Sequence, residues 1–188
     1  MIDDPSQEEL VERAQAGDVH AFTELYQTHR SQICTYLARL VGHNDQWPDL
    51  DQETFFQVWR RLPELRCAHQ FKSWLYRIAT NKAMSFLREA EREKKYYQRL
   101  SDDEEYISNT YPSTPGPEEK VAEEDWLKRA LRELEPQCRA CLLLYVVGGF
   151  SQGEIATMLG ILESTVSGNV CRGRKYLRYY RSLEKRDL

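Results

Sequence analysis

Hydrophobic side chains recur every three to four residues along most of the chain, and the strict alternation typical of β-strands is rare. Gly17-Asp18 interrupts this pattern once, and Pro63 ends a second periodic stretch. In the N-terminal half the period predicts helices over residues 8–16, 22–41, 50–62 and 71–87, the last running into a charged stretch at 88–99. We therefore predict an all-α fold.

The periodic pattern stops after Leu100, in the segment SDDEEYISNTYPSTPGP, which is rich in proline and acidic residues. Such a composition is typical of a solvated linker. Helical spacing returns over 121–134, and Pro136 starts a further helix that reaches Val147. We expect two small helical domains, residues 5–97 and 118–183, joined by a flexible acidic linker at 98–117.

The segment SQGEIATMLGILESTVSGNV, residues 151–170, has the pattern of a helix-turn-helix. Ser151 and Glu154 have the spacing of a capping box, and Gly160 suits the left-handed conformation that ends a helix. The second helix of such a motif lies in the major groove of DNA. Its first two turns offer small polar residues, with no cation before Arg172.

The amino-acid composition limits the classes of protein to which this chain can belong. Of the 188 residues, 41% are hydrophobic, which is enough to form a folded core. No apolar run is long enough to cross a membrane, and the N-terminal MIDDPSQEEL lacks the features of a secretory signal. We expect a cytoplasmic protein without membrane insertion, and with only SLEKRDL after Arg181, no appended regulatory domain.

The sequence offers no pattern of catalysis or metal binding. The five cysteines are odd in number and scattered, and the C-x-x-C of Cys138 and Cys141 begins an apolar run, so we interpret these thiols as core residues. The four histidines are dispersed, and no phosphate-binding glycine loop or nucleophile motif is present in the sequence. We expect no catalytic residue, no metal and no cofactor.

The net charge of −4 does not favour nucleic-acid binding, but the charges are unevenly distributed. Acidic residues gather in the linker, while Lys and Arg outnumber Asp and Glu after Gln152 and in the stretch 88–99. Both helical segments therefore carry a basic portion that suits a phosphate backbone.

Two stretches together resemble a known family. DLDQETFFQVWRRLPELR followed by FKSWLYRIATNKAMSFLR resembles region 2 of the extracytoplasmic-function (ECF) sigma factors, in the sigma-70 superfamily. LRELEPQCRACLLLYVVGGFSQGEIATMLGILESTVSGNVCRGRKYLR resembles their region 4. The resemblance implies a subunit of bacterial RNA polymerase that catalyses nothing itself but binds the polymerase core, recognises promoter DNA and is held inactive by an anti-sigma factor.

The family implies roles for residues of the first domain. The helix that contains Asp49, Gln52, Glu53 and Arg60 would dock on the polymerase, and Asp49, Gln52 and Glu53 share one face by their spacing. Trp47 could be an additional anchor beside them. The loop before the next helix, together with that helix, would bind the melted minus-ten element through Arg66, His69, Lys72, Trp74, Arg77, Asn81 and Arg88. Together with Leu75 and Ile78, Trp74 also fits a place in the core, which is the place that we favour.

In the second domain, the family implies that the helix-turn-helix reads the duplex minus-thirty-five element. The candidate contacts are Ser164, Thr165, Ser167, Gly168, Asn169, Arg172, Arg174 and Lys175. The phosphate-binding end of this helix is kept, whereas Ser167 and Asn169 stand where family members often carry Lys or Arg, and Gly168 stands where they often carry Ser. We expect the melted element to dominate promoter choice, or a helper protein to supply the missing affinity; a different cognate sequence is the simpler alternative.

Other classes of function remain. A repressor or activator with one helix-turn-helix would explain the second domain but not the D-L-x-Q-E-T-F helix. A sigma-like adaptor that docks on polymerase without independent promoter choice would explain both domains and the sparse reading helix.

Overall fold

The computed structural model describes residues 5–42, 47–100 and 126–184, and these ranges contain helices and turns but no strand. The all-α prediction is confirmed. The helices are α1 Gln7–Gln15, α2 Val19–Val41, α3 Trp47–Arg61, the short 3-10 turns η1 Leu62–Glu64 and η2 Ala68–Gln70, α4 Phe71–Leu100, α6 Pro136–Val146, α7 Gln152–Leu159 and α8 Glu163–Glu184. Residues 126–132 are also helical. Most of the expected linker lies outside the described residues.

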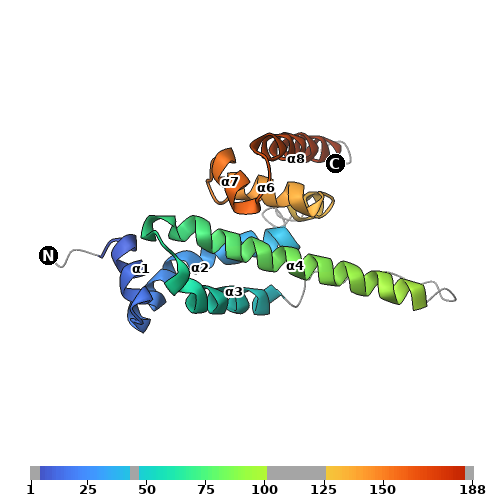
Figure 1. Cartoon of the computed structure of the whole chain (residues 1–188). Helices are drawn as coiled ribbons and strands as arrows, with labels where there is room; N and C mark the ends of the chain where they lie inside the picture. The colour runs from blue at the N-terminus through green and yellow to red at the C-terminus, as the bar shows by residue number, and fades with distance from the viewer. Residues whose placement is uncertain (1–4, 43–46, 101–125, 185–188) are drawn as a thin grey trace, which may run out of the picture.

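The described helices form two groups (Figure 1). In the first group, α2 packs against α1, α3 and α4, and in the second, α8 packs against α6 and α7. α4 is the longest element, and its C-terminal part extends past the other helices. Its predicted core portion and the charged stretch at 88–99 therefore form one continuous helix, with residues 88–98 exposed.

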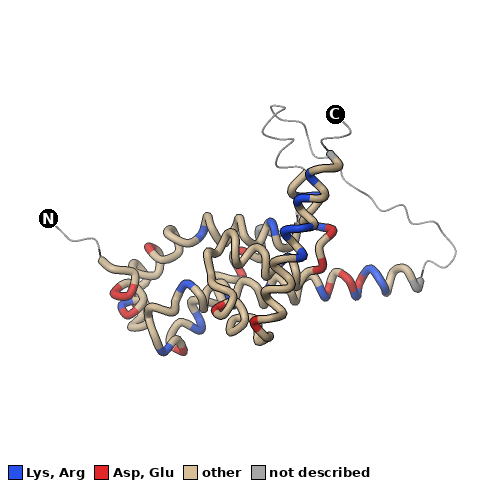
Figure 2. Tube along the Cα trace, turned by 90° about the horizontal axis from the view of Figure 1, so that it is seen from above, with Lys and Arg blue, Asp and Glu red and all other residues tan. Residues whose placement is uncertain are grey.

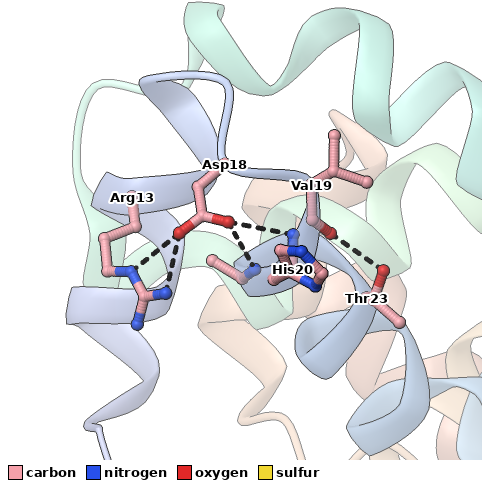
Figure 3. Close-up of polar contacts among 6 residues, drawn as sticks. Arg13, Asp18, Val19, His20 and Thr23 are labelled. Carbon is pink, nitrogen blue, oxygen red and sulfur yellow. Dashed lines mark hydrogen bonds and ion pairs between the residues drawn. The ribbon is translucent and has the colours of Figure 1, made fainter.

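The corner between α1 and α2 is fixed by local polar contacts (Figure 3). Asp18 caps α2 by accepting hydrogen bonds from the backbone N–H groups of His20 and Ala21, and it pairs with Arg13 at 2.7 Å. The hydrogen bond from Arg13 and those from the backbone lower the pKa of the Asp18 carboxyl. Gly17 adopts a positive φ of 96°, which a residue with a side chain rarely takes. The break predicted at Gly17-Asp18 is confirmed.

A buried tyrosine pair joins α2 to α4. The Tyr36 and Tyr76 rings lie 5.2 Å apart in an edge-to-face arrangement, and the Tyr36 hydroxyl is 2.7 Å from Thr80 Oγ1. This hydroxyl pairing satisfies polar atoms that would be costly to bury alone. The contact sets the position of α4, the helix that carries several candidate site residues.

The two helical groups pack directly on each other. α6 lies against α2 and α4, α7 lies against α4, and the buried side chains of both groups form one continuous cluster. The prediction of two small helical domains is confirmed, and the sequence does not indicate how the two lie relative to each other. In the structure Phe150, at 6% exposure, and Tyr76 meet edge to face across the boundary between them.

A search of the described helices finds none with the length and apolar character needed to cross a membrane.

Candidate functional site

The exposed face of α3 carries the residues expected to dock on a partner. Gln52, Glu53 and Arg60 are exposed, whereas Phe55 and Val58 of the same helix are buried. The side chains of Asp49 and Trp47 lie outside the described residues. The amphipathic division of this helix is therefore as predicted at the three positions that can be observed.

An apolar patch adjoins this face. Val19 of α2 and Phe56 of α3 are 62% and 63% exposed, and a hollow of about 440 Å³ beside them is lined by Phe22, Tyr26 and Trp59 among others. An exposed apolar patch beside polar residues is typical of a protein-binding surface. Sequence reasoning missed Phe56, because neighbouring positions of a helix can both be buried and the pair Phe55-Phe56 does not show which ring is exposed.

A groove of about 800 Å³ lies between α3 and α4. Residues expected to contact polymerase and residues expected to contact DNA both line it. Glu53 and Arg60, expected to contact polymerase, line it together with Asn81, expected to contact DNA. Lys82 forms a 2.9 Å ion pair with Glu53 across the groove. Lys82 carried no signal in the sequence, because its position opposite Glu53 depends on how α3 packs against α4.

The loop before α4 presents Arg66 and His69 to solvent, and Arg77 and Asn81 are exposed further along the helix. Arg88 is also exposed and donates to the Met84 carbonyl at 3.0 Å. Trp74, by contrast, is 7% exposed. Of the two places left open for Trp74, the structure shows the core, so its ring is not available to stack on a base in this arrangement.

Lys72 lies at the boundary between the two helical groups. Its ammonium donates a hydrogen bond to the Gly148 carbonyl at 2.9 Å and lies 5.2 Å from the centre of the Phe150 ring. A hollow of about 540 Å³ runs beside it, lined from the first group by His69, Gln70, Ser73, Trp74 and Arg77 and from the second by Gly153, Glu154, Thr157 and Met158. Several candidate DNA contacts thus face the second helical group.

The helix-turn-helix is formed as predicted. Ser151 caps α7, and the Glu154 carboxylate accepts a 2.8 Å hydrogen bond from the Ser151 backbone N–H. The Ser151 hydroxyl also donates to this carboxylate at 2.7 Å, and that bond, followed by the one from the backbone N–H, lowers the pKa of the Glu154 carboxyl. Gly160 ends α7 with φ 66° and ψ 36°, the left-handed conformation.

The outer face of α8 is polar and then basic. Its exposed residues include Cys171 and the candidates Ser164, Thr165, Ser167, Gly168, Arg172, Arg174 and Lys175. Figure 2 shows Lys and Arg gathered along α8, whereas basic and acidic residues alternate along the projecting part of α4. Arg174 also stacks over the Tyr145 ring of α6 at 4.8 Å. A cationic helix face of this kind suits a phosphate backbone.

Asn169 departs from the expectation. It is 2% exposed, its amide nitrogen lies 3.5 Å from the Cys141 sulfur, and its oxygen accepts a 2.6 Å hydrogen bond from Arg172. Asn169 therefore holds α8 against α6 and orients Arg172, and it does not lie on the face that would approach base edges. Asn169 is a polar residue among the apolar ones that α8 buries. In the sequence alone, such a residue looks the same as an outward-facing side chain that contacts bases.

The part of the chain that the structure describes contains no cluster of three or more His, Cys, Asp and Glu side chains suited to a metal ion. All five cysteines are free thiols, and Cys138 and Cys141 are buried as expected for core residues. Burial raises the pKa of both thiols. The arrangement offers surfaces for binding.

Comparison with protein families identifies both parts of the chain. The sequence model described as sigma-70 region 2 matches residues 25–93, and the one described as sigma-70, region 4 matches residues 124–177. The first span contains most of α2 together with α3 and most of α4, and the second contains α6, α7 and most of α8.

Curated relatives match across nearly the full length. The ECF RNA polymerase sigma-E factor of Haemophilus influenzae is 29% identical over 183 residues, covering 94% of this chain and 96% of the relative. The ECF RNA polymerase sigma factor SigE of Mycolicibacterium smegmatis is 31% identical, over 85% of this chain and 61% of the relative. The RNA polymerase sigma-H factor of Pseudomonas aeruginosa is 27% identical, over 93% of each chain.

Solved structures share the fold. CnrH, in complex with the cytosolic domain of CnrY, superposes with a TM-score of 0.68 at 22% identity over 95% of this chain and 99% of CnrH. The sigma factor RpoE of Bartonella quintana, in complex with the anti-sigma factor NepR, gives 0.69 at 24% identity over 87% of this chain and 98% of RpoE. At these identities the likeness concerns the fold.

Proposed function

Because the chain belongs to the ECF sigma factors of the sigma-70 family, we propose that it binds the core of bacterial RNA polymerase and directs transcription initiation at promoter DNA. The observation that carries the proposal is the order of the two family matches, region 2 over 25–93 and region 4 over 124–177, on the two helical groups of the structure. The protein supplies promoter choice, and the polymerase core supplies the chemistry.

In this proposal, the first domain, residues 5–97, docks on the polymerase and binds the melted minus-ten element. Gln52, Glu53, Arg60 and the unobserved side chain of Asp49 form the polymerase contact, and Phe56 adds an apolar anchor beside them. Aromatic anchors next to polar groups dominate the energy of many protein interfaces.

The DNA contacts of the first domain are Arg66, His69, Lys72, Arg77, Asn81 and Arg88. With the exception of Lys72, each is exposed in the structure, and together they offer cations and hydrogen-bond donors to a single strand. Lys72 must leave the Gly148 carbonyl before it can contact DNA.

The second domain, residues 118–183, binds the duplex minus-thirty-five element through α8. Arg172, Arg174 and Lys175 grip phosphates, and Ser164, Thr165, Ser167 and Gly168 form the part that meets base edges. With Asn169 turned inward, this part has no side chain able to make the bidentate contacts that read guanine or adenine.

Control by an anti-sigma factor completes the proposal. The solved RpoE relative is bound to the anti-sigma factor NepR, and this chain shares its fold. The hollow between α4 and α7 and the exposed face of α3 are the surfaces that such a partner would have to cover.

Transcription with purified polymerase core lacking its own sigma factor tests this function. We expect the chain to bind core and to yield transcripts with defined start sites from a promoter library. Glu53→Arg should weaken core binding ~10-fold or more, the equivalent of ~1.4 kcal/mol. Glu24→Arg, the same change on the exposed face of α2, is the matched control and should bind normally. A wild-type chain that does not join core would refute the function.

A sigma-like adaptor without independent promoter choice is the second candidate, and the inward position of Asn169 favours it. Run-off transcription separates the two. A chain that binds core with wild-type tightness but starts transcription nowhere in the library is an adaptor.

A further inference from the structure

The loop between α6 and α7 is shaped to reach Lys72. Gly149 has a positive φ of 74°. A Cβ on Gly148 would lie 2.6 Å from the Phe150 ring and 2.7 Å from the Leu144 carbonyl oxygen, so only glycine allows the ring to fold back here. The consequence is a corner, residues 148–150, which presents one carbonyl oxygen and one aromatic ring to α4.

This corner offers Lys72 the two kinds of group that a nucleic-acid strand would offer. The Gly148 carbonyl oxygen takes the place of a phosphate oxygen at 2.9 Å, and the Phe150 ring takes the place of a base under the ammonium at 5.2 Å. Phe150 also packs edge to face on Tyr76, one turn further along α4, at 5.1 Å. The second domain thus occupies the position on α4 that the strand needs.

A second contact across the same boundary buries a charged side chain, and burying a charge costs free energy. Arg139 of α6 is 5% exposed and donates to the Leu40 carbonyl of α2 at 2.7 Å and to the Leu134 carbonyl at 3.1 Å. Among the described residues its Nε has no hydrogen-bond partner, and burial lowers the pKa of its guanidinium. A buried cation that meets only carbonyl oxygens stabilises less than its contacts suggest. The boundary is therefore suited to reversible opening.

Resting on the proposed function, we infer that residues 148–150 are an intramolecular competitor of the promoter strand: they hold Lys72 in a closed arrangement of the two domains, and DNA binding requires their release. The closed arrangement lowers the apparent affinity for the promoter strand in proportion to the fraction of molecules that are open. If ~90% of free molecules are closed, apparent affinity is weakened ~10-fold.

Acetylation of lysines in the free full-length chain, followed by mass spectrometry, tests the closure. Phe150→Leu keeps an apolar side chain but removes the ring, and Arg139→Met removes the hydrogen bond to the Leu40 carbonyl across the boundary, which leaves that buried oxygen without this donor. In both variants we expect the rate at Lys72 to rise ~5-fold or more relative to exposed Lys175, as expected when a mostly closed population opens. Val146→Ala, at a 62% exposed position of α6, is the control and should leave Lys72 protected. Equal Lys72 rates in wild type and both folded variants would overturn the inference.

The competition itself is tested with polymerase core and a promoter selected by transcription. Both opened variants, in complex with core, should bind the promoter more tightly than wild type, by up to ~10-fold, and in the open complex Lys72 should be protected again by DNA. Unchanged promoter affinity, or a Lys72 that stays reactive in the open complex, would overturn the inference while the sigma function stands. Loss of the sigma function would look different, because wild type and variants alike would fail to join core.

Discussion

The side-chain oxygen of Asn169 accepts a hydrogen bond from the Arg172 guanidinium at 2.6 Å, while its amide nitrogen faces the Cys141 sulfur of α6 at 3.5 Å. One buried amide therefore joins the outer surface of α8 to the core beneath it. This relationship changes what a substitution at position 169 is expected to do.

Asn169→Ala should destabilise the second domain and should not change the preference for any single base. The change removes a buried side chain together with its hydrogen bonds, a kind of loss that costs ~0.5–3 kcal/mol, and it frees Arg172 from its fixed position. Thermal unfolding and promoter binding over a base-substitution series measure the two effects. Ser167→Ala, on the exposed face of the same helix, is the control. A loss confined to one base pair in N169A would mean that the residue reads DNA directly.

The two glycines inside α8 should respond oppositely to alanine. A Cβ at Gly168 would meet no atom within 4 Å, so Gly168→Ala should stabilise the helix by ~0.5–1 kcal/mol. A Cβ at Gly173 would lie 3.0 Å from Leu142 Cδ2 and 3.6 Å from Cys138 Sγ. Gly173→Ala should destabilise, because overpacking costs ~1–3 kcal/mol and exceeds the helix gain. Paired urea unfolding curves measure this difference, and two shifts of the same sign would contradict it.

His29 should make the stability of the first domain depend on pH. It is 5% exposed and lies 5.5 Å from the Phe71 ring, and burial, followed by the charge of Lys72, lowers its pKa below the ordinary 6.5. As the pH falls, His29 therefore becomes protonated in the unfolded chain before it does so in the folded chain. The contribution of neutral His29 to the free energy of unfolding is therefore fully present above pH 6.5 and is lost as the pH falls below that value.

Urea unfolding between about pH 5 and pH 7.5 measures this loss. His29→Gln, which keeps a side-chain amide near Gln7, should flatten the dependence, whereas exposed His20→Gln should not. An unchanged slope in H29Q would assign the pH dependence to other groups.

Cysteine reactivity should separate Cys171 from Cys34. Burial and hydrogen bonding to Asp51 raise the pKa of the Cys34 thiol to about 11, so only ~0.1% of it is thiolate at about pH 8. Cys171 is exposed on the outer face of α8. Iodoacetamide should modify Cys171 first, and promoter DNA in the complex with polymerase should protect it. Mass spectrometry after timed quenching gives the order, and earlier modification of Cys34 would contradict its half-buried position on α2 and the raised pKa of its thiol.

Local signals in the sequence were sufficient for much of this fold. The capping residues Asp18 and Ser151 and the terminating Gly160 act within one turn of their own helix, so their spacing alone predicts the helix ends. The outward face of α3 followed from its period in the same way. These features depend on neighbours in the chain and not on distant residues.

The features that the sequence did not reveal depend on packing between distant helices. The ion pair between Lys82 and Glu53, the inward turn of Asn169 and the contact of Lys72 with Gly148 each join residues at least 28 positions apart. The sequence around a polar residue in a helix does not show which distant helix packs against that residue. The packing of the two domains was missed for the same reason, since Phe150 looks like an ordinary apolar residue of a loop and Arg139 like an ordinary residue of α6.

Promoter choice should be concentrated in the melted element. The exposed reading turns of α8 hold Ser164, Ser167 and Gly168, and each missing bidentate contact removes ~1–3 kcal/mol of discrimination. The first domain keeps Arg66, Arg77 and Asn81 exposed for the single strand. Transcripts selected from a library with both elements randomised should therefore show strong base preferences in the minus-ten element and weak ones in the minus-thirty-five element. Strong preferences at several positions of the minus-thirty-five element would mean that small polar side chains, or the shape of the groove, provide specificity there. The first domain would then account for a smaller share of promoter choice than we expect.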